Sequence, residues 1–517
     1  MRRALLLALA ACAACSARAP APNACGASAC QVTRDTFTQA APLALDLLFV
    51  LDNSRATDPP RRSLATHLAA LTAPLQAVHA DLHVGLITTD LGAGPGAVAA
   101  LACQPGGDGG RLQNTPRGAG CDGAHLVDPA NRFLAWAPDP AGGAPVANFT
   151  GSLPEAFACY AELASGCEAE HQLAAIGAAL DGCHVAGGCS VTANNGFLRP
   201  GAFLQVVILT DEDDCSAPPW TTLFDPSPEA AAVLGPLTSY RCFEYGVLCH
   251  GADPGREPGS RFGCEPGSAD PDPAHQLIAV ELFAAFLQSL KADPRMVGVA
   301  VIGGPPAPVA VGAGVNGPDL QPSCASALGA ADPAIRLAAF VDLFAADRGA
   351  FFTVCQNDLR PPLATLAGRL APAAPGVGAC LSAPLRNADA TGRALQPACT
   401  VREQALGAAG SSREIPRCAP VVCDPAAGDC ARLTHTLPAG APACWYVWPD
   451  AAACGPARPG GVASGYRLRV DRGVYADGEP VPPAAAVETV VDCATCPADP
   501  PDCSPACAWN WPERCGG

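Results

Sequence analysis

Two short stretches decide the fold: LDLLFVLDNS at residues 45–54 and LQVVILTD at residues 204–211. Each is an apolar run that ends abruptly in an aspartate. A run without regular polar alternation predicts a strand covered on both faces, as in a parallel sheet between layers of helices. Ligands of open parallel sheets bind beyond the carboxyl ends of the strands. The two stretches therefore predict that Asp52, Ser54 and Asp211 converge on one surface site.

Strand-like and helix-like segments alternate on both sides of these runs. Leucines recur at helical spacing between residues 61 and 79, and the segment HVGLITT at residues 83–89 predicts the next strand. The alternation continues to residue 370. We therefore predict an α/β domain at residues 43–371, built on a doubly wound, mostly parallel sheet. Loop-rich, disulfide-closed insertions are expected at residues 92–150 and 212–272.

The chain of 517 residues is too long for one compact core, so two or more domains are expected. Beyond residue 371 the alternation stops, and the remainder is rich in Cys and Pro with short strand-like segments such as YRLRV at 466–470. We predict that residues 372–517 form a small β module held by disulfides. Residues 16–42 are predicted to be a polar linker with one disulfide, between Cys25 and Cys30.

The N-terminus predicts export. Two arginines precede an apolar segment at residues 4–11, which is too short to span a membrane and is typical of a secretory signal. It resembles a bacterial lipoprotein signal, in which cleavage leaves a lipidated cysteine at the new N-terminus. Leu9 favours Cys12 as the anchor, whereas the length of the signal favours Cys15 and a signal at residues 1–15. The alternative is ordinary secretion, with both cysteines discarded or disulfide-bonded.

The cysteine count also indicates export, since 28 cysteines are far too many for a reducing cytosol. Twelve lie between Cys103 and Cys355 and twelve between Cys380 and Cys515, so each region can pair internally. Cys493 and Cys496 have zinc-ligand spacing, but in such a tail disulfides are the preferred interpretation. The net charge of −17 argues against nucleic acid as a partner and suits a cation or a basic partner.

Residues 46–57 and 204–216 together resemble the von Willebrand factor A domain, the fold of integrin inserted domains. That family carries a metal-ion-dependent adhesion site made of Asp-x-Ser-x-Ser after the first strand, a Thr from a middle loop, and an Asp after the fourth strand. Asp52 and Ser54 match the first two positions and Asp211 the last. The third position is Ala56, and Cys167 stands where the Thr is expected.

Neighbouring residues suggest substitutes for the two missing hydroxyls. Thr57 is one place late and is expected to point elsewhere unless the loop shifts. Glu168 or Glu170 could supply an oxygen in place of the middle Thr. Asp213 and Asp214 are expected to add negative potential that partly compensates for the lost ligands.

The resemblance implies a divalent cation (Mg²⁺, Mn²⁺ or Ca²⁺) held by Asp52, Ser54 and Asp211, with waters completing the coordination. An open position on the ion could accept a carboxylate from a protein partner. Alternatively, Asp52 and Asp211 are relics and Ser54 caps the following helix.

Within the family the chain looks most like the secreted, Cys-rich A-domain lipoproteins of high-GC Gram-negative bacteria. We therefore predict a lipid-anchored protein of the bacterial envelope, at the outer membrane, that acts by binding and is not an enzyme. One alternative is a structural envelope protein with a non-functional metal site. A metal-dependent hydrolase is the other, although no paired base and nucleophile is evident in the sequence.

Overall fold

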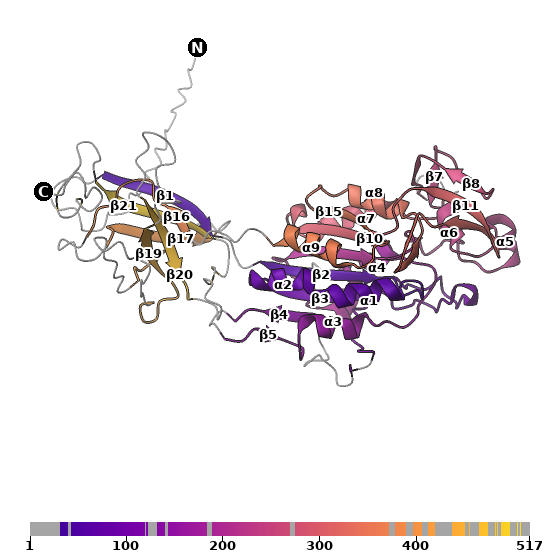
Figure 1. Ribbon diagram of the computed structural model, residues 1–517, viewed down its shortest axis with the longest axis horizontal. Helices are drawn as coiled ribbons and strands as arrows, with labels where there is room; N and C mark the ends of the chain where they lie inside the picture. The colour runs from indigo at the N-terminus through magenta and orange to yellow at the C-terminus, as the bar shows by residue number, and fades with distance from the viewer. Residues whose placement is uncertain are drawn as a thin grey trace, which may run out of the picture. The chain divides into compact units, whose positions relative to one another are not determined.

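The computed structural model describes most of the chain. The described residues are 31–39, 43–118, 120–121, 132–139, 143–183, 189–268, 275–371, 378–388, 396–405, 412–418, 437–449, 454, 465–473, 481, 483, 487–496, 504 and 507. The chain divides into two compact units (Figure 1). The α/β unit takes residues 42–374, and the β unit combines the residues before 42 with those from 375 onward.

A seven-stranded sheet forms the centre of the α/β unit, in the order β15-β10-β6-β2-β3-β4-β5. Its five parallel strands are β2 (Ala44–Leu51), β3 (Asp81–Thr88), β6 (Phe203–Leu209), β10 (Val297–Gly303) and β15 (Gly349–Thr353). The antiparallel strands β4 (Leu134–Ala137) and β5 (Val146–Ala147) extend one edge. The unit is therefore a mixed α/β structure with a mostly parallel sheet.

Helices cover both faces of the sheet, as Figure 1 shows. One face packs against α1 (Asp58–His67), α2 (Ala69–Ala77), α3 (Leu153–Ala161) and α9 (Arg360–Leu370). The other face packs against α4 (Gln172–Leu180), α7 (Val280–Ser289) and α8 (Ile335–Asp342).

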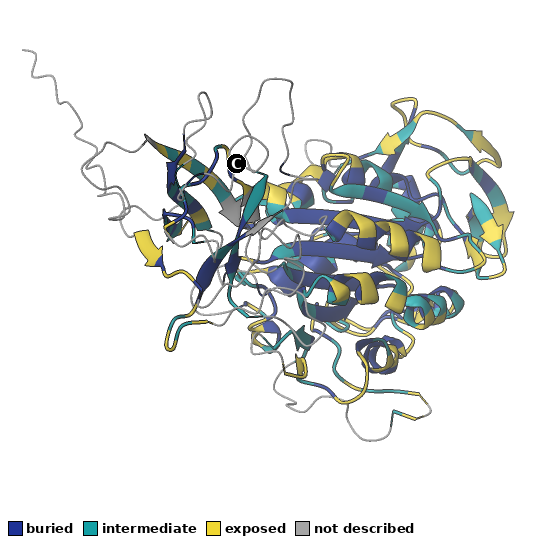
Figure 2. Cartoon of the chain, turned by 60° about the vertical axis from the view of Figure 1, so that its left-hand side comes forward, coloured by how far each residue is buried: buried dark blue, intermediate teal, exposed yellow. Residues whose placement is uncertain are grey.

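Strand β2 shows why its sequence lacks polar alternation. Leu47, Phe49 and Leu51 belong to one core, Leu48 and Val50 belong to the other, and all five are fully buried. The central strands are accordingly dark blue in Figure 2. The prediction of a strand covered on both faces is confirmed.

The helix predicted at residues 61–79 differs in its bounds and is divided. It begins at Asp58, with prolines in the first turn, and is broken at Leu68 into α1 and α2. Proline suits a first turn because the N–H that it lacks would have no partner there.

Both predicted insertions are closed by disulfides. The first supplies β4 and β5. The second contributes α5 (Pro228–Leu234), α6 (Tyr240–Glu244), β7 (Val247–Cys249), β8 (Gly259–Arg261) and β9 (Cys264–Pro266). Strand β8 pairs with β11 (Val309–Gly314), which also pairs with β12 (Gly317–Gln321). The hairpin β13 (Cys324–Ser326) and β14 (Gly329–Ala331) precedes α8.

Disulfide pairing in the α/β unit is internal, as the even count predicted. The pairs are Cys103–Cys167, Cys121–Cys159, Cys183–Cys189, Cys215–Cys242, Cys249–Cys264 and Cys324–Cys355.

Two antiparallel sheets make up the described part of the β unit. The first has the order β1-β21-β17-β18 and the second β16-β20-β19. These strands are β1 (Gln31–Gln39), β16 (Gly378–Cys380), β17 (Cys399–Ala405), β18 (Ser412–Ile415), β19 (Cys444–Pro449), β20 (Tyr466–Asp471) and β21 (Val487–Thr495). Residues of both sheets share one core, in which Trp445 is 3% exposed.

Disulfides hold this unit together as well. The pairs among its described residues are Cys380–Cys454, Cys399–Cys493, Cys418–Cys444 and Cys496–Cys507. Cys493 and Cys496 thus bind different partners, which removes their thiolates from any zinc site. A disulfide-held β module was predicted, and the described residues form one.

The predicted linker at residues 16–42 is wrong for residues 31–39. This segment is β1, which pairs antiparallel with β21 along its length, from Gln31 opposite Thr495 to Gln39 opposite Val487. Sequence analysis missed the strand because it is mostly polar and its partner is far away in the chain. The α/β unit is consequently inserted, in sequence, between the first strand of the β unit and the rest.

The predicted signal at residues 1–15, the candidate anchors Cys12 and Cys15, and the predicted pair Cys25–Cys30 lie outside the described residues. Among the helices that the structure describes, none is both long and apolar enough to cross a membrane.

Candidate functional site

The candidate site lies where the order of the parallel strands reverses. From β2 the chain proceeds to β3 and β4 on one side, and from β6 to β10 and β15 on the other. Connections that leave neighbouring strands in opposite directions create a crevice at the carboxyl ends of those strands. Asp52 follows β2 directly, Asp211 follows β6, and the Asp52 N–H donates to Leu209 O at 3.0 Å. The strand ends that carry Asp52, Ser54 and Asp211 therefore meet as predicted, but the three side chains are buried and do not form the surface site that was expected.

Asp52 is fully buried and held only by uncharged donors. Its Oδ1 accepts the Ser54 N–H at 2.8 Å, and its Oδ2 accepts the Thr210 hydroxyl at 2.8 Å. Thr210 Oγ1 in turn accepts from Gln172 Nε2 at 3.0 Å. This chain of hydrogen bonds connects the ends of β2 and β6 to the start of α4.

Thr57 is a site residue that sequence reasoning placed outside the site. Its Oγ1 lies 3.3 Å from Asp52 Oδ1 and 3.5 Å from Ser54 Oγ. The loop turns tightly before α1, so that the Asp52 and Ser54 carbonyl oxygens both lie 2.8 Å from Thr57 Oγ1, whose single proton is donated to one of these acceptors at a time. Arg61 Nη1 donates to the same Oγ1 at 3.1 Å. A hydroxyl is thus available near the position that Ala56 leaves without one. Thr57 is also the residue that precedes α1, so Ser54 is not the helix cap that the alternative interpretation required.

Arg61 is a buried basic side chain that contacts this loop, and it forms no ion pair with the Asp52 carboxylate among the described residues. Its Nη1 donates to the carbonyl oxygens of Asp52 at 2.8 Å and Ser54 at 3.2 Å. Its ion pair is with Asp58. Arg61 therefore fixes the backbone of the loop and leaves the Asp52 carboxylate without a cationic partner.

Asp211 is 8% exposed, and its Oδ1 has no hydrogen-bond partner among the described residues. Burial, followed by the charge of Asp52, raises the pKa of Asp211 to about 8. Burial and Asp211 likewise raise the pKa of Glu212 well above its usual value, and burial raises that of Asp332 to about 7. Within the described chain, none of these three carboxylates forms an ion pair with a basic side chain.

The middle loop, around Gly166, lies against the loop that follows Asp52. It lacks the threonine whose hydroxyl was expected from the resemblance as a metal ligand. The Gly166 N–H donates to Asn53 O at 3.0 Å, and Asn53 Nδ2 donates to Ala164 O at 3.1 Å. Cys167 is buried and disulfide-bonded to Cys103, so it cannot replace a threonine.

Of the two proposed substitutes in that loop, Glu168 is exposed and Glu170 is buried. Glu170 Oε2 accepts a hydrogen bond from the Thr89 hydroxyl, whereas Oε1 has no partner among the described residues. Burial, and next the charge of Asp52, raises the pKa of Glu170 well above its usual value.

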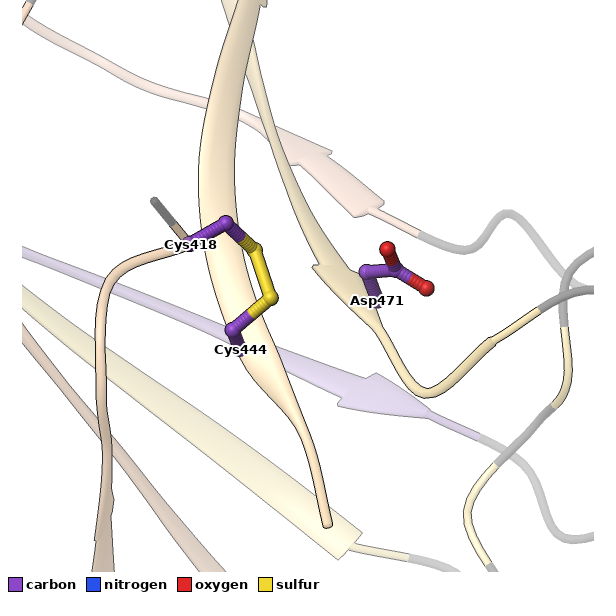
Figure 3. Close-up of side chains that lie close together, drawn as sticks. All are labelled: Cys418, Cys444 and Asp471. Carbon is purple, nitrogen blue, oxygen red and sulfur yellow. A yellow bond between two sulfur atoms is a disulfide. The ribbon is translucent and has the colours of Figure 1, made fainter. Parts of the chain in front are cut away.

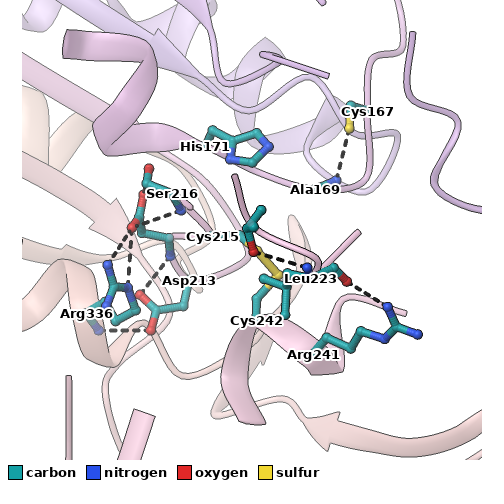
Figure 4. The surroundings of a disulfide bond; sticks show 12 residues. Cys167, Ala169, His171, Asp213, Cys215, Ser216, Leu223, Arg241, Cys242 and Arg336 are labelled. Carbon is teal, nitrogen blue, oxygen red and sulfur yellow. Dashed lines mark hydrogen bonds and ion pairs between the residues drawn. A yellow bond between two sulfur atoms is a disulfide. The ribbon is translucent and has the colours of Figure 1, made fainter. Parts of the chain in front are cut away.

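Asp213 and Asp214 do not add free negative charge to the site, contrary to the prediction. Asp213 accepts the Arg336 and Leu337 N–H groups at 2.8 and 3.1 Å and thereby caps α8. Asp214 pairs with Arg336 at 3.1 Å and accepts the Leu173 N–H at the start of α4. Figure 4 shows Asp213 and Ser216 beside Arg336, close to the Cys215–Cys242 disulfide. The carboxylates that interact with Asp211 are instead those of Glu212 and Asp332, whose pKa values are themselves raised.

A second group of metal-ligating residue types occurs in the β unit, where Cys418, Cys444 and Asp471 lie together (Figure 3). Cys418 and Cys444 form a disulfide, so neither offers a thiolate. Within the described residues this is the one group of three Cys, His or acidic side chains with ligand atoms within 4.8 Å of one another. No third carboxylate therefore approaches Asp52 and Asp211 that closely.

Comparison with known proteins yields little. No family model matches the chain, and no curated protein matches it. Among solved structures, a conserved hypothetical protein BatB from Bacteroides thetaiotaomicron is 9% identical, with a TM-score of 0.23, over 64% of this chain and 97% of that one.

Two pilus adhesins show similarly low values. SpaC from Lactobacillus rhamnosus GG is 8% identical (TM-score 0.27; 90% of this chain, 42% of that one). RrgA from Streptococcus pneumoniae is 11% identical (TM-score 0.22; 90% and 58%). Similarities at this level carry no weight for function.

Proposed function

We propose that residues 43–371 form a von Willebrand factor A-like domain that holds a divalent cation at its carboxyl edge and there binds a protein partner. The sequence resemblance suggests this, and the strand order with its reversal between β2 and β6 supports it. The protein acts by binding, as a lipoprotein of the bacterial envelope anchored to the outer membrane through Cys12 or Cys15. Its disulfides fit an exported protein.

One observation carries the proposal: a buried pair of carboxylates without a basic partner. Asp52 and Asp211 are buried side by side, and Asp211 Oδ1 has no hydrogen-bond partner among the described residues. Two like charges in a desolvated site are unfavourable unless a proton or a cation compensates them. A divalent cation with a preference for oxygen would do so.

The direct protein ligands of such a cation would be Asp52, Ser54 and Asp211, with the Thr57 hydroxyl next to them. The expected ions are Mg²⁺, Mn²⁺ or Ca²⁺. The rim of the site is exposed at Arg55, Ala56 and Ser165. A partner that contacts this rim could offer a carboxylate to an open position on the ion.

Isothermal titration calorimetry of each ion into chelator-stripped protein tests the cation site. We expect binding heat that both Asp52→Ala and Asp211→Ala abolish, while Asp347→Asn at an exposed ion pair leaves it unchanged. Absence of heat from folded protein with all three ions would favour the structural envelope protein with a non-functional site.

The partner requires a second experiment. Immobilised protein loaded with Mg²⁺ is expected to retain a partner that EDTA releases and that the Asp52→Ala variant does not capture. A partner that remains bound in EDTA would contradict the metal-bridged mode. Turnover of phosphate or carboxylate esters that depends on the metal would favour the hydrolase.

A further inference from the structure

We propose that a small pocket next to the cation site binds a primary ammonium group, the end of a Lys side chain that belongs to the protein partner. The pocket lies between the segment after β6, helix α6 and strand β12. The inference rests on the proposed function and specifies its partner, which presents a Lys close to the carboxylate that it offers to the ion.

Polar side chains and aromatic rings line the pocket together. The polar side chains include those of Glu212, Asp332 and Ser239. The rings are those of Tyr240 and Phe243, which are 4% and 6% exposed. Carboxylates and aromatic rings both attract a cation, and the rings also suit the methylene groups of an organic cation. The lining therefore fits a side chain with a positively charged end.

Four carboxylates line the pocket, and two of them have partners within the protein. Asp214 forms an ion pair with Arg336 at 3.1 Å, and Asp213 accepts two N–H groups at the start of α8. Glu212 and Asp332 are partly buried and form no ion pair within the described part of the chain. Partly desolvated carboxylates favour a nearby cation, so these two are the candidate acceptors for an ammonium group.

The size of the pocket selects among cations. Its volume is about 30 Å³, and one water-sized group needs about 10–15 Å³ of such space. The pocket therefore admits the ammonium and last methylene of a Lys, but not the larger, planar guanidinium of an Arg. A metal ion is disfavoured, because within the described residues no three acidic ligand atoms of the pocket lie within 4.8 Å of one another.

The Lys must come from another protein. Lys291 is the only lysine of this chain, its side chain is 1% exposed, and its Nζ lies 3.4 Å from Asp46. A second copy of the chain has the same single, buried lysine and therefore cannot fill the pocket with one. The net charge of −17 likewise favours a basic partner.

Covalent and hydrogen bonds hold the pocket next to the cation site. Glu212 directly follows Asp211 in the chain, and the Asp332 N–H donates to Asp211 O at 2.8 Å. The Cys215–Cys242 disulfide joins the segment after β6 to α6 (Figure 4). One partner can therefore reach both sites, with a carboxylate at the ion and a Lys in the pocket.

The test is calorimetry of a capped Gly-Gly-Lys-Gly-Gly peptide into the oxidised full chain, in metal-free buffer of low ionic strength. We expect the Lys peptide to bind, its Nε-acetylated form to give no heat, and the Arg peptide to bind at least about threefold more weakly. Glu212→Gln and Asp332→Asn should each weaken the Lys peptide at least about fivefold. Glu229→Gln, at an exposed carboxylate of α5, should change its binding by less than about twofold.

Unfolding curves show whether each variant is folded. An equal loss of binding in Glu229→Gln would mean that only the general negative charge acts, and would overturn the pocket. Equal affinity for the Arg peptide would overturn the assignment to an ammonium group, and binding of 1,5-diaminopentane without binding of the peptide would overturn Lys as its source. Because the peptide is titrated without metal, a wild-type protein that binds the peptide but no cation would overturn the proposed cation site and support the pocket.

Discussion

A fully buried aspartate lies near the amino end of strand β2 and another directly after its carboxyl end, and the two have opposite surroundings. Near the amino end, Asp46 accepts from the Arg199 N–H and from Arg199 Nε, both at 2.8 Å, and lies 3.4 Å from Lys291 Nζ. Beyond the carboxyl end, Asp52 accepts only from uncharged groups and lies beside Asp211. Burial alone thus does not identify a ligand site. The balance of charge around the buried group distinguishes the two ends.

The same comparison explains what each end contributes. At the amino end, Lys291 is the only lysine of the chain, and its side chain is 1% exposed. Its charge and that of Arg199 compensate Asp46 within the protein, so this cluster is structural. At the carboxyl end no basic side chain of the described residues pairs with Asp52 or Asp211, so a proton or an external cation is needed for compensation, in agreement with the proposed cation site.

The largest effect is expected from breaking the cluster at the amino end. Asp46→Asn leaves the buried Lys291 ammonium without its carboxylate and takes from Arg199 one of its two carboxylate partners, so it should lower the free energy of unfolding by about 3 kcal/mol. Unfolding in guanidinium chloride, with the disulfides intact, measures this change in the free energy of unfolding. Asp347→Asn, which breaks an exposed pair, should change the value by less than about 0.5 kcal/mol. If Asp46→Asn lowers the free energy of unfolding by less than about 1 kcal/mol, the proposed difference between the two ends of β2 is wrong.

The carboxyl end should respond in the opposite direction. Without metal at pH 8, Asp211→Asn should raise the free energy of unfolding by on the order of 1 kcal/mol, because it removes one of two repelling carboxylates. The raised pKa of about 8 means that the folded state binds the proton more tightly than the unfolded state. Metal-free wild-type protein should therefore lose stability as the pH rises from about 4 to 8.

Saturating Mg²⁺ provides the control for this prediction. The ion should stabilise wild-type protein and not Asp211→Asn, so that the order of stability reverses. If the variant is less stable than wild type in EDTA as well, the carboxyl end is structural like the amino end.

A smaller effect is expected from the hydroxyl of Thr57. Thr57→Val keeps the shape of the side chain and removes its hydrogen bonds to the Asp52 loop, so cation binding should weaken by about three- to tenfold. Calorimetry measures the change. Thr66→Val, at an exposed hydroxyl of α1, is the matched control and should leave binding unchanged. Equal affinities for the two variants would exclude Thr57 from the site.

The smallest effect on stability is expected from His83, which lies near Asp46 at the amino end of β2. Burial, then the charge of Arg199, lowers its pKa. The unfolded chain therefore binds the proton more tightly, and stability falls as the pH drops below about 6.5. His83→Gln should flatten this slope between pH 7 and 5 by less than about 1 kcal/mol, as seen in unfolding midpoints. An unchanged slope would assign the acid sensitivity to other groups.

Some of this organisation was predictable from the sequence. The uninterrupted apolar runs before Asp52 and Asp211 predicted two central strands, because only strands covered on both faces lack polar alternation. Parallel strands bring their carboxyl ends together, so the meeting of these aspartates followed. The even numbers of cysteines predicted pairing within each region, which the described disulfides confirm.

Other features depend on contacts between distant residues. Strand β1 is recognisable only beside β21, whose residues lie more than 440 positions away. The turn before α1 brings Thr57 to Asp52, although Thr57 is one position later than the motif requires and was expected to point elsewhere. Arg336, in α8 after the fourth parallel strand, forms an ion pair with Asp214 and compensates its charge. Composition and periodicity do not contain such pairings.

The sequence by itself determined the layered α/β sheet, the disulfide-held β module and the acidic pair at the strand ends. These follow from local patterns of apolar residues and from the direction of parallel strands. Only the tertiary structure decided which acidic residues are compensated and which are not. Desolvation and charge pairing act through space, so Asp46 and Asp52 can lie at opposite ends of one strand with the same degree of burial and still differ in chemistry.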